Sequence, residues 1–153
     1  MGGRGARAEL VGRGLTVGVI AARYNQEIVE ALVESALEAL AEHGATAEPV
    51  LWVPGSFELP LAALSLAETG AVDAVVCLGC VIKGDTAHFE HVSSAAAQGI
   101  LQASLDSGVP CTFGVLTTYT EGQAKDRLDK GREAAETAIE MAGLIARLQT
   151  RTG

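Results

Sequence analysis

Four short apolar stretches recur along the chain, and a segment with helical spacing of apolar residues follows each of them. The stretches are LTVGVIA from Leu15, EPVLWV from Glu48, VDAVVCLG from Val72 and VPCTFGVL from Val109. They are rich in β-branched residues and several are apolar on both faces, which is typical of parallel strands buried beneath helices. Helical crossovers between such strands predict a three-layer α/β/α sandwich with a central parallel sheet of about four strands.

The first two helices are expected after the first two strands. Residues 26–43 place apolar side chains at every third or fourth position, with an acidic row on another face and Gly44 as a stop. Ser56 is expected to cap the second helix, because a serine hydroxyl accepts from backbone N–H groups of the first turn. Pro60 then falls within that turn, where its missing N–H removes no intrahelical bond, and Gly70 ends the helix.

The third helix is expected over residues 88–107, with one face of small residues. That face is compatible both with tight packing on the sheet and with a subunit interface. The fourth helix starts at Thr120, which forms a Thr-x-x-Gln capping box with Gln123. It is expected to run to residue 148, with a break near residues 130–131.

A chain of 153 residues predicts one domain. We assign it to residues 15–149, with an N-terminal extension at 1–14 that could pair with a neighbouring subunit and a C-terminal tail at 150–153. So small a parallel sheet leaves its edges and helix faces poorly buried, and we therefore expect a homo-oligomer.

The charge balance excludes several classes of partner. Nineteen acidic residues outnumber 11 basic ones and give a formal charge of -8, which argues against nucleic acid and anionic membranes. No apolar run reaches the roughly 18 residues of a membrane helix, and the first residues lack the apolar segment of a signal peptide. Three cysteines in apolar stretches suit a reducing compartment, so a cytoplasmic protein is expected.

The reactive side chains gather where the predicted strands end. In open parallel sheets ligands bind at the carboxyl ends of the strands. The residues that follow the strands are Arg23, Tyr24 and Asn25; Pro54, Gly55, Ser56, Phe57 and Glu58; Lys83, Gly84, Asp85, Thr86 and His88; and Thr117, Thr118, Tyr119 and Thr120. This edge of the sheet is the predicted ligand site.

The segment from Gly79 to Thr86 has the glycine spacing of a P-loop but carries Asp85 in place of its lysine, which argues against a nucleoside triphosphate. A glycine-containing turn that opens a helix still favours an anion, because the N–H groups of the first turn are unpaired. Lys83 and the Thr86 hydroxyl would strengthen such a site for a phosphate monoester. The alternative is that Asp85 or Thr86 merely caps the helix.

His88 lies in the first turn of this helix and could move protons near neutral pH. His91, one turn further along, is expected to be packed. A zinc or redox site built on Cys77 and Cys80 is not expected, because the two sulfurs would point to opposite faces of a strand. The residues therefore predict an enzyme or binding protein for a small phosphorylated metabolite, with no metal and no dinucleotide.

Six segments, spread in order over most of the chain, resemble the lumazine synthase family. They are ARYN at 22–25, VPGSFELP at 53–60, LGCVIKGDTAHFEHV at 78–92, FGVLTT at 113–118, QAKDR at 123–127, and KG at 130–131 with AIEMA at 138–142. The resemblance implies a flavodoxin-like fold, pentamers that in some members close into an icosahedral shell, and active sites between subunits. Whether this chain forms pentamers, decamers or shells stays open.

The resemblance also implies the penultimate reaction of riboflavin biosynthesis, without a cofactor. A ribitylaminouracil, 5-amino-6-(D-ribitylamino)uracil, condenses with 3,4-dihydroxy-2-butanone 4-phosphate to give 6,7-dimethyl-8-ribityllumazine, phosphate and water. Two alternatives are a catalytically weak relative that forms a shell or binds flavin, and a riboflavin synthase of similar fold. The retained phosphate turn and Arg127 count against the riboflavin synthase.

Site residues follow from the resemblance position by position. Tyr24 would stack on the pyrimidine, where the family usually has phenylalanine. His88 would shuttle protons and Arg127 would bind the phosphate. The other substrate-binding residues implied are Asn25, Ser56, Phe57, Glu58, Val81, Ile82, Lys83, Gly84, Asp85, Thr86, Phe113 from an adjacent subunit, and Lys130 near the ring. One departure is a connection between Arg127 and Lys130 that is shorter than the family's.

Overall fold

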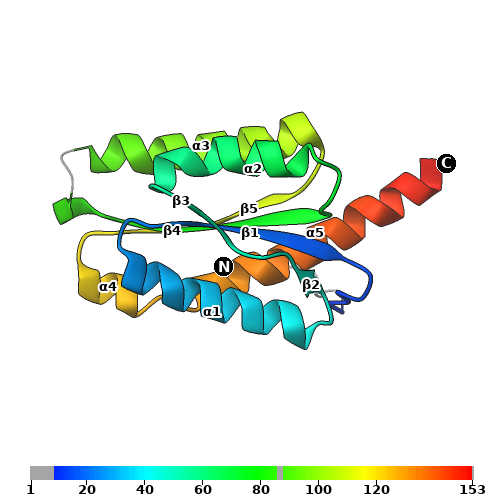
Figure 1. The fold of residues 1–153 in the computed structure, drawn as a ribbon, viewed down its shortest axis with the longest axis horizontal. Helices are drawn as coiled ribbons and strands as arrows, with labels where there is room; N and C mark the ends of the chain where they lie inside the picture. The colour runs from blue at the N-terminus through cyan, green and yellow to red at the C-terminus, as the bar shows by residue number, and fades with distance from the viewer. Residues whose placement is uncertain (1–8, 86–87, 153) are drawn as a thin grey trace, which may run out of the picture.

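A parallel sheet forms the middle layer of the molecule, and helices cover both of its faces (Figure 1). The computed structural model describes residues 9–85 and 88–152. The long strands are β1 (Thr16–Ala22), β4 (Ala74–Ile82) and β5 (Cys111–Thr118), with β4 between the other two. Every residue of β4 is buried, as expected of a strand covered on both faces. The predicted α/β/α sandwich of flavodoxin-like type is confirmed.

The edge beside β1 holds two short strands where the sequence predicts one over residues 48–53. β2 (Thr46–Ala47) and β3 (Leu51–Val53) both pair with β1 in parallel. Pro49 lies between them and has no N–H to donate to the ladder, which explains the interruption. The sheet therefore has five strands, two of which share one edge.

The helices divide into two layers (Figure 1). One face of the sheet is covered by α1 (Gln26–Glu42), α4 (Glu121–Lys125) and α5 (Lys130–Thr152), and the other by α2 (Leu59–Ala67) and α3 (Phe89–Ser107). Each face has its own hydrophobic core. The apolar stripe of α1 is buried and its acidic row is exposed, as predicted.

Close backbone packing and an ion pair hold α5 against α1. A Cβ added to Gly131 would overlap the carbonyl oxygen of Leu32 and lie 3.0 Å from its carbonyl carbon. Next to it, Arg132 donates from both terminal nitrogens to the Glu42 carboxylate, each at 2.9 Å. The hydrogen bond to Arg132 and its charge hold the pKa of Glu42 below its usual value. This contact positions the start of α5, beside the predicted site residues Arg127 and Lys130.

The second helix begins later than predicted, and Ser56 does not cap it. Residues Ser56–Glu58 form a 3-10 helix, η1, and Glu58 takes the N-cap position of α2. The Glu58 N–H donates to the Gly55 carbonyl at 3.1 Å, which closes this tighter turn first. Pro60 lies in the first turn of α2, as predicted. The tighter turn directs Ser56 inward, where it is 4% exposed.

The small-residue face of α3 packs within its own chain. Gly99 faces α2, and a Cβ added there would lie 2.5 Å from the Pro60 ring. Ala96, Ile100 and Ala103 of the same face are buried in the core beneath α2 and α3. Of the two interpretations left open by the sequence, packing on the sheet and on α2 accounts for this face.

The predicted fourth helix is two helices, α4 and α5. The capping box is confirmed: Thr120 Oγ1 accepts from the Gln123 N–H at 3.1 Å, and Gln123 Oε1 accepts from the Thr120 N–H at 3.3 Å. The break expected near 130–131 spans residues 126–129, so Lys130 begins α5. α5 then continues through Thr152 and extends beyond the sheet (Figure 1).

Residues 9–14 are the described part of the predicted N-terminal extension. The Gly12 N–H donates to the His43 carbonyl at 2.7 Å, and Leu10 packs against the core beneath α1 and α5. Pairing of the extension with a neighbouring subunit stays a prediction, because residues 1–8 lie outside the described part. Within the described ranges, no helix has the length and apolarity needed to cross a bilayer.

Candidate functional site

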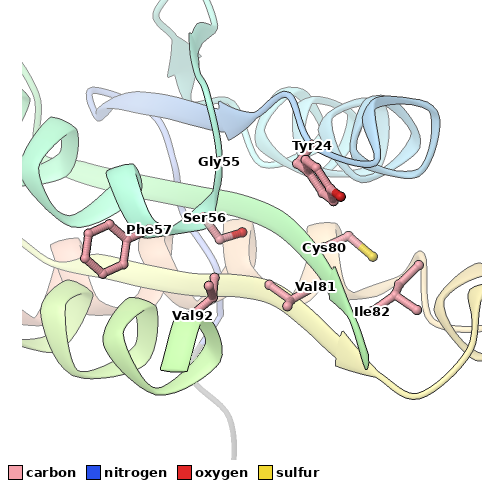
Figure 2. A pocket seen from close by; sticks show the side chains of 8 residues that line it. All are labelled: Tyr24, Gly55, Ser56, Phe57, Cys80, Val81, Ile82 and Val92. Atoms are coloured by element: carbon pink, nitrogen blue, oxygen red, sulfur yellow. The ribbon is translucent and has the colours of Figure 1, made fainter. Parts of the chain in front are cut away.

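A cavity of about 240 Å³ lies at the carboxyl ends of the strands. Its lining comes from the end of β1, the β3–α2 connection, the end of β4 and the start of α3 (Figure 2). The lining residues are Tyr24, Gly55, Ser56, Phe57, Cys80, Val81, Ile82 and Val92. Five of the predicted substrate-binding residues, Tyr24, Ser56, Phe57, Val81 and Ile82, are among them. The edge predicted from strand order is therefore hollowed where those residues meet.

Asn25 ties the end of β1 to β4. Its backbone has the left-handed conformation, with φ 61 and ψ 45, which asparagine tolerates better than most residues. Its side-chain Nδ2 donates to the Cys80 carbonyl at 2.9 Å. This bond holds the neighbouring Tyr24 at the rim of the cavity, where its ring is 55% exposed. An exposed ring held in this way can stack on a planar ligand.

The β3–α2 connection contributes the polar side of the site. Gly55 is extended, with φ -155 and ψ 178, and the chain then enters η1 with Ser56 turned inward. Phe57 lies at the mouth and is 62% exposed. Glu58 is exposed, and its Oε1 would lie 3.3 Å from a Cβ added to Gly55, so the carboxylate extends back over this turn.

Val92 lines the cavity and Gly79 lies against one of the lining residues, although the sequence analysis assigned neither of them to the site. A Cβ added to Gly79 would lie 2.5 Å from Ser56 Oγ, so only glycine leaves room for that hydroxyl. A glycine inside an otherwise apolar strand signals such a close approach. Val92 lines the cavity from α3, one helical turn after His88, whose carbonyl accepts from the Val92 N–H at 2.9 Å. The spacing of four residues between His88 and Val92, one helical turn, was the sequence signal that could have placed Val92 at the site.

The predicted phosphate turn follows β4 directly. Lys83 and Gly84 are exposed in a 3-10 helix, η2 (Lys83–Asp85), and no atom of the described residues lies within 4 Å of a Cβ added to Gly84, apart from its chain neighbours. Thr86 lies outside the described residues. The N-cap residue of α3 is His88. The alternative interpretation, in which Asp85 or Thr86 caps this helix, is therefore wrong.

The two histidines at the start of α3 are both exposed. His88 stands at the N-cap without a side-chain hydrogen bond to the helix. The prediction that His91 is packed is wrong, because His91 lies on the solvent face of α3, in line with the exposed Ser94 and Gln98. The two ring centroids are 6.1 Å apart.

Phe113, Arg127 and Lys130 form a separate group. Lys130 Nζ lies 5.9 Å from the centroid of the Phe113 ring, and both residues line a second hollow of about 230 Å³ with Glu133. Arg127 Nη2 lies 3.4 Å from Glu133 Oε2. None of the three residues belongs to the described lining of the first cavity. One chain therefore presents the predicted site residues as two distinct groups.

The cysteines lie where the strand geometry places them. Cys77 belongs to the core beneath α2 and α3 and Cys80 to the core beneath α1 and α5, so their side chains are on opposite faces, as predicted. Burial raises the pKa of the Cys77 thiol far above its usual value and also raises the pKa of Cys111. Among residues 9–85 and 88–152, no three His, Cys, Asp or Glu side chains are grouped as a metal site requires.

A family model described as 6,7-dimethyl-8-ribityllumazine synthase matches residues 14–146. The 6,7-dimethyl-8-ribityllumazine synthase of Salinibacter ruber is 47% identical over 148 residues, which cover 92% of this chain and 95% of the relative. The protein of the same description from Protochlamydia amoebophila is 45% identical over 139 residues, covering 86% of this chain and 81% of the relative.

Proposed function

The chain belongs to the 6,7-dimethyl-8-ribityllumazine synthase family and acts as a lumazine synthase in riboflavin biosynthesis, and we propose that it does so at the cavity lined by Tyr24 and Ser56. Its substrates are 5-amino-6-(D-ribitylamino)uracil and 3,4-dihydroxy-2-butanone 4-phosphate. The observation that carries the proposal is one cavity that combines an exposed aromatic ring, an inward hydroxyl and an apolar floor. A flat ring with a polyol chain needs these three features.

The pyrimidine binds between Tyr24 and the end of β4. The Tyr24 ring stacks on the heterocycle, and the backbone of Val81 and Ile82 faces its polar edge. The Asn25 amide nitrogen is already bonded to Cys80, so its Oδ1 accepts from a ligand N–H or O–H. Ser56 and Glu58 hold the ribityl hydroxyls, with Phe57 beside them at the mouth.

The phosphate of the second substrate binds at the turn after β4. Lys83 supplies positive charge, and Gly84 allows the backbone to approach the phosphate because no side chain stands there. Asp85 and Thr86 complete the turn by sequence. Arg127 provides a planar guanidinium, which can donate two parallel hydrogen bonds to a phosphate.

Phe113, Arg127 and Lys130 reach the cavity from a neighbouring chain in a homo-oligomer of pentamers. Their separation from the cavity within one chain supports this arrangement. A wide apolar hollow of about 560 Å³ also follows the open edge of β5 between α3 and α5. An uncovered edge strand beside apolar surface is a site that natural proteins cover with another chain. The Lys130 ammonium would then approach the heterocycle.

The chemistry needs positioning and proton transfer and no bound cofactor. The amine of the pyrimidine attacks the ketone carbonyl and forms an imine with loss of one water. Phosphate then leaves with its oxygen, and the ribityl-bearing nitrogen attacks the remaining carbonyl and closes the ring with loss of a second water. Holding two substrates in contact lowers a barrier by about 7–11 kcal/mol in well-oriented cases. His88, at the start of the helix that lines the cavity, takes up and returns the protons.

The proposal is tested by mixing the purified protein with both substrates and recording lumazine absorbance and phosphate release together. Formation of both products above the protein-free background is the expected result. If the folded oligomer yields neither product, the proposal is wrong, and the chain is instead a catalytically weak relative that forms a shell or binds flavin. Riboflavin formation from two lumazines would instead identify a riboflavin synthase.

Replacing His88 by alanine is expected to lower kcat by at most about 10²-fold, the low end for a positioned base, because the exposed ring leaves water able to replace it. The KM values and the size of the assembly should stay unchanged. His91→Ala removes an exposed imidazole from the same helix and should leave kcat unchanged. If His88→Ala and His91→Ala have the same kcat, His88 does not transfer protons in the reaction.

A further inference from the structure

Tyr119 contacts residues on both sides of the predicted phosphate turn. It directly follows β5, and the residue is 66% exposed. Lys83 Nζ lies 5.3 Å from the ring centroid, and the Phe89 ring centroid lies 6.2 Å from it at an interplanar angle of 31°. Lys83 directly follows β4 and opens η2, whereas Phe89 opens α3. One aromatic side chain therefore links the end of β4 to the start of α3 across Gly84 and His88.

The backbone of Tyr119 is itself well anchored. Its N–H donates to Gln123 Oε1 at 2.9 Å, which is the side chain that completes the capping box of α4. Thr118 Oγ1 donates to the Thr120 carbonyl at 2.9 Å across the same residue. Two hydrogen bonds thus hold the connection between β5 and α4, and Tyr119 projects from a fixed backbone.

A ring suits this position better than a carboxylate would. The negative face of an aromatic ring attracts an ammonium group but does not neutralise it, so the full charge of Lys83 stays available to a phosphate. A free lysine side chain loses considerable rotamer entropy when it binds a ligand, and a side chain already held against a ring loses less. Contact with Tyr119 therefore prepares Lys83 for an anion.

We infer that Tyr119 is a positioning residue that holds the Lys83 ammonium over the phosphate turn, and that it contributes in this way to recognition of the phosphorylated substrate. The inference rests on the proposed function, in which Lys83 supplies charge to the phosphate. Tyr119 acts through Lys83 and Phe89 and need not touch the substrate. Its phenol hydroxyl is not required, because the ring alone makes both contacts.

The test compares Tyr119→Leu with Tyr119→Phe in steady-state assays in which each substrate is varied in turn. Tyr119→Leu should raise KM for the phosphorylated butanone roughly fivefold, the upper range for an exposed cation–π contact, and leave kcat and KM for the pyrimidine unchanged. Tyr119→Phe should restore the wild-type KM. Leu148→Ala, which removes another exposed apolar side chain far along α5, is the control for a general surface effect.

A double-mutant cycle tests whether Tyr119 acts through Lys83. Lys83→Gln should weaken binding of the phosphorylated substrate, and adding Tyr119→Leu to it should cause no further loss. Fully additive losses, an equal rise of both KM values, or a Tyr119→Phe variant that behaves like Tyr119→Leu would each overturn the inference.

Calorimetric binding of inorganic phosphate separates this inference from the proposed function. The dissociation constant for phosphate should rise about fivefold in Tyr119→Leu and stay unchanged in Tyr119→Phe. This measurement needs no turnover, so it tests the role of Tyr119 even if the wild-type protein forms no lumazine. In that case the proposed function is wrong, but the inference about Tyr119 can still be confirmed. If Tyr119→Leu leaves the dissociation constant for phosphate unchanged, the inference about Tyr119 is wrong. The proposed function is not affected by that result, because lumazine formation is measured separately.

Discussion

Replacing Arg127 by alanine is expected to lower kcat/KM for the phosphorylated butanone by about 10²-fold, with little change in KM for the pyrimidine. A hydrogen bond to a charged group contributes about 1.5–3 kcal/mol, and 1.4 kcal/mol corresponds to a factor of ten. A guanidinium on a phosphate makes such bonds in pairs. Steady-state kinetics with each substrate varied in turn measure both effects.

The structure shows Arg127 in contacts that a phosphate can replace. Its Nε lies 3.5 Å from Asp129 Oδ1 and its Nη2 lies 3.4 Å from Glu133 Oε2, and the side chain is 53% exposed. Long, exposed ion pairs of this kind contribute little, so exchanging them for a phosphate costs little. The short connection from Arg127 to Lys130 is a turn that leaves the guanidinium outside the helices.

Two controls make the Arg127 experiment specific. Arg151→Ala removes an exposed arginine near the end of α5 and should change neither KM. Arg127→Lys keeps the charge but loses the planar fork, and we expect an intermediate loss. If Arg127→Ala weakens the binding of both substrates equally, Arg127 stabilises the assembly and does not bind the phosphate.

Replacing Gly131 by alanine is expected to destabilise the fold by about 3 kcal/mol, the upper range for overpacking a core. The added Cβ would overlap the Leu32 carbonyl oxygen and lie 3.2 Å from the Leu32 Cα, and these backbone atoms cannot rotate away. Relief requires α5 to move from α1, which would also strain the hydrogen bonds between Arg132 and Glu42. Urea unfolding at a fixed protomer concentration measures the loss.

Gly143→Ala is the matched control on the same helix. Among the described residues, a Cβ there would meet only the end of the Arg147 side chain, at 3.6 Å. Alanine is better than glycine inside a helix by about 1 kcal/mol, so this variant should be as stable as the wild type or more stable. Equal unfolding midpoints for Gly131→Ala and Gly143→Ala would show that the packing of α5 on α1 tolerates a side chain at residue 131.

The sequence predicted the sandwich and the ligand edge because both depend on local pattern. A β-branched apolar run and a helical stripe each record how a segment is buried, and β1, α1 and β4 followed their patterns. The capping box of Thr120 and Gln123 was equally readable, since its bonds join residues three positions apart. The reactive side chains meet at one edge because all strands of a parallel sheet end there.

One error arose where a distant contact overrides a local preference, and two arose where a local signal in the sequence was not used. Ser56 looked like a helix cap, but the 3-10 turn directs it into the gap left by Gly79, on a strand far along the chain. The edge strand was predicted as continuous, although Pro49 divides its ladder. His91 was predicted as packed because it lies one turn further into its helix, but it falls on the solvent face of α3 with Ser94 and Gln98.

By itself, then, the sequence determined the order of the main strands and helices, and which side chains follow the strands at their carboxyl ends, because periodicity, caps and strand order act within short stretches of chain. Only the tertiary structure decided that Asn25 is bonded to Cys80, that Gly131 meets Leu32, and that the site residues form two groups in one chain. These contacts join residues far apart in sequence. Whether they form depends on differences in distance of a few tenths of an ångström, and no pattern of residue types along the chain contains that information.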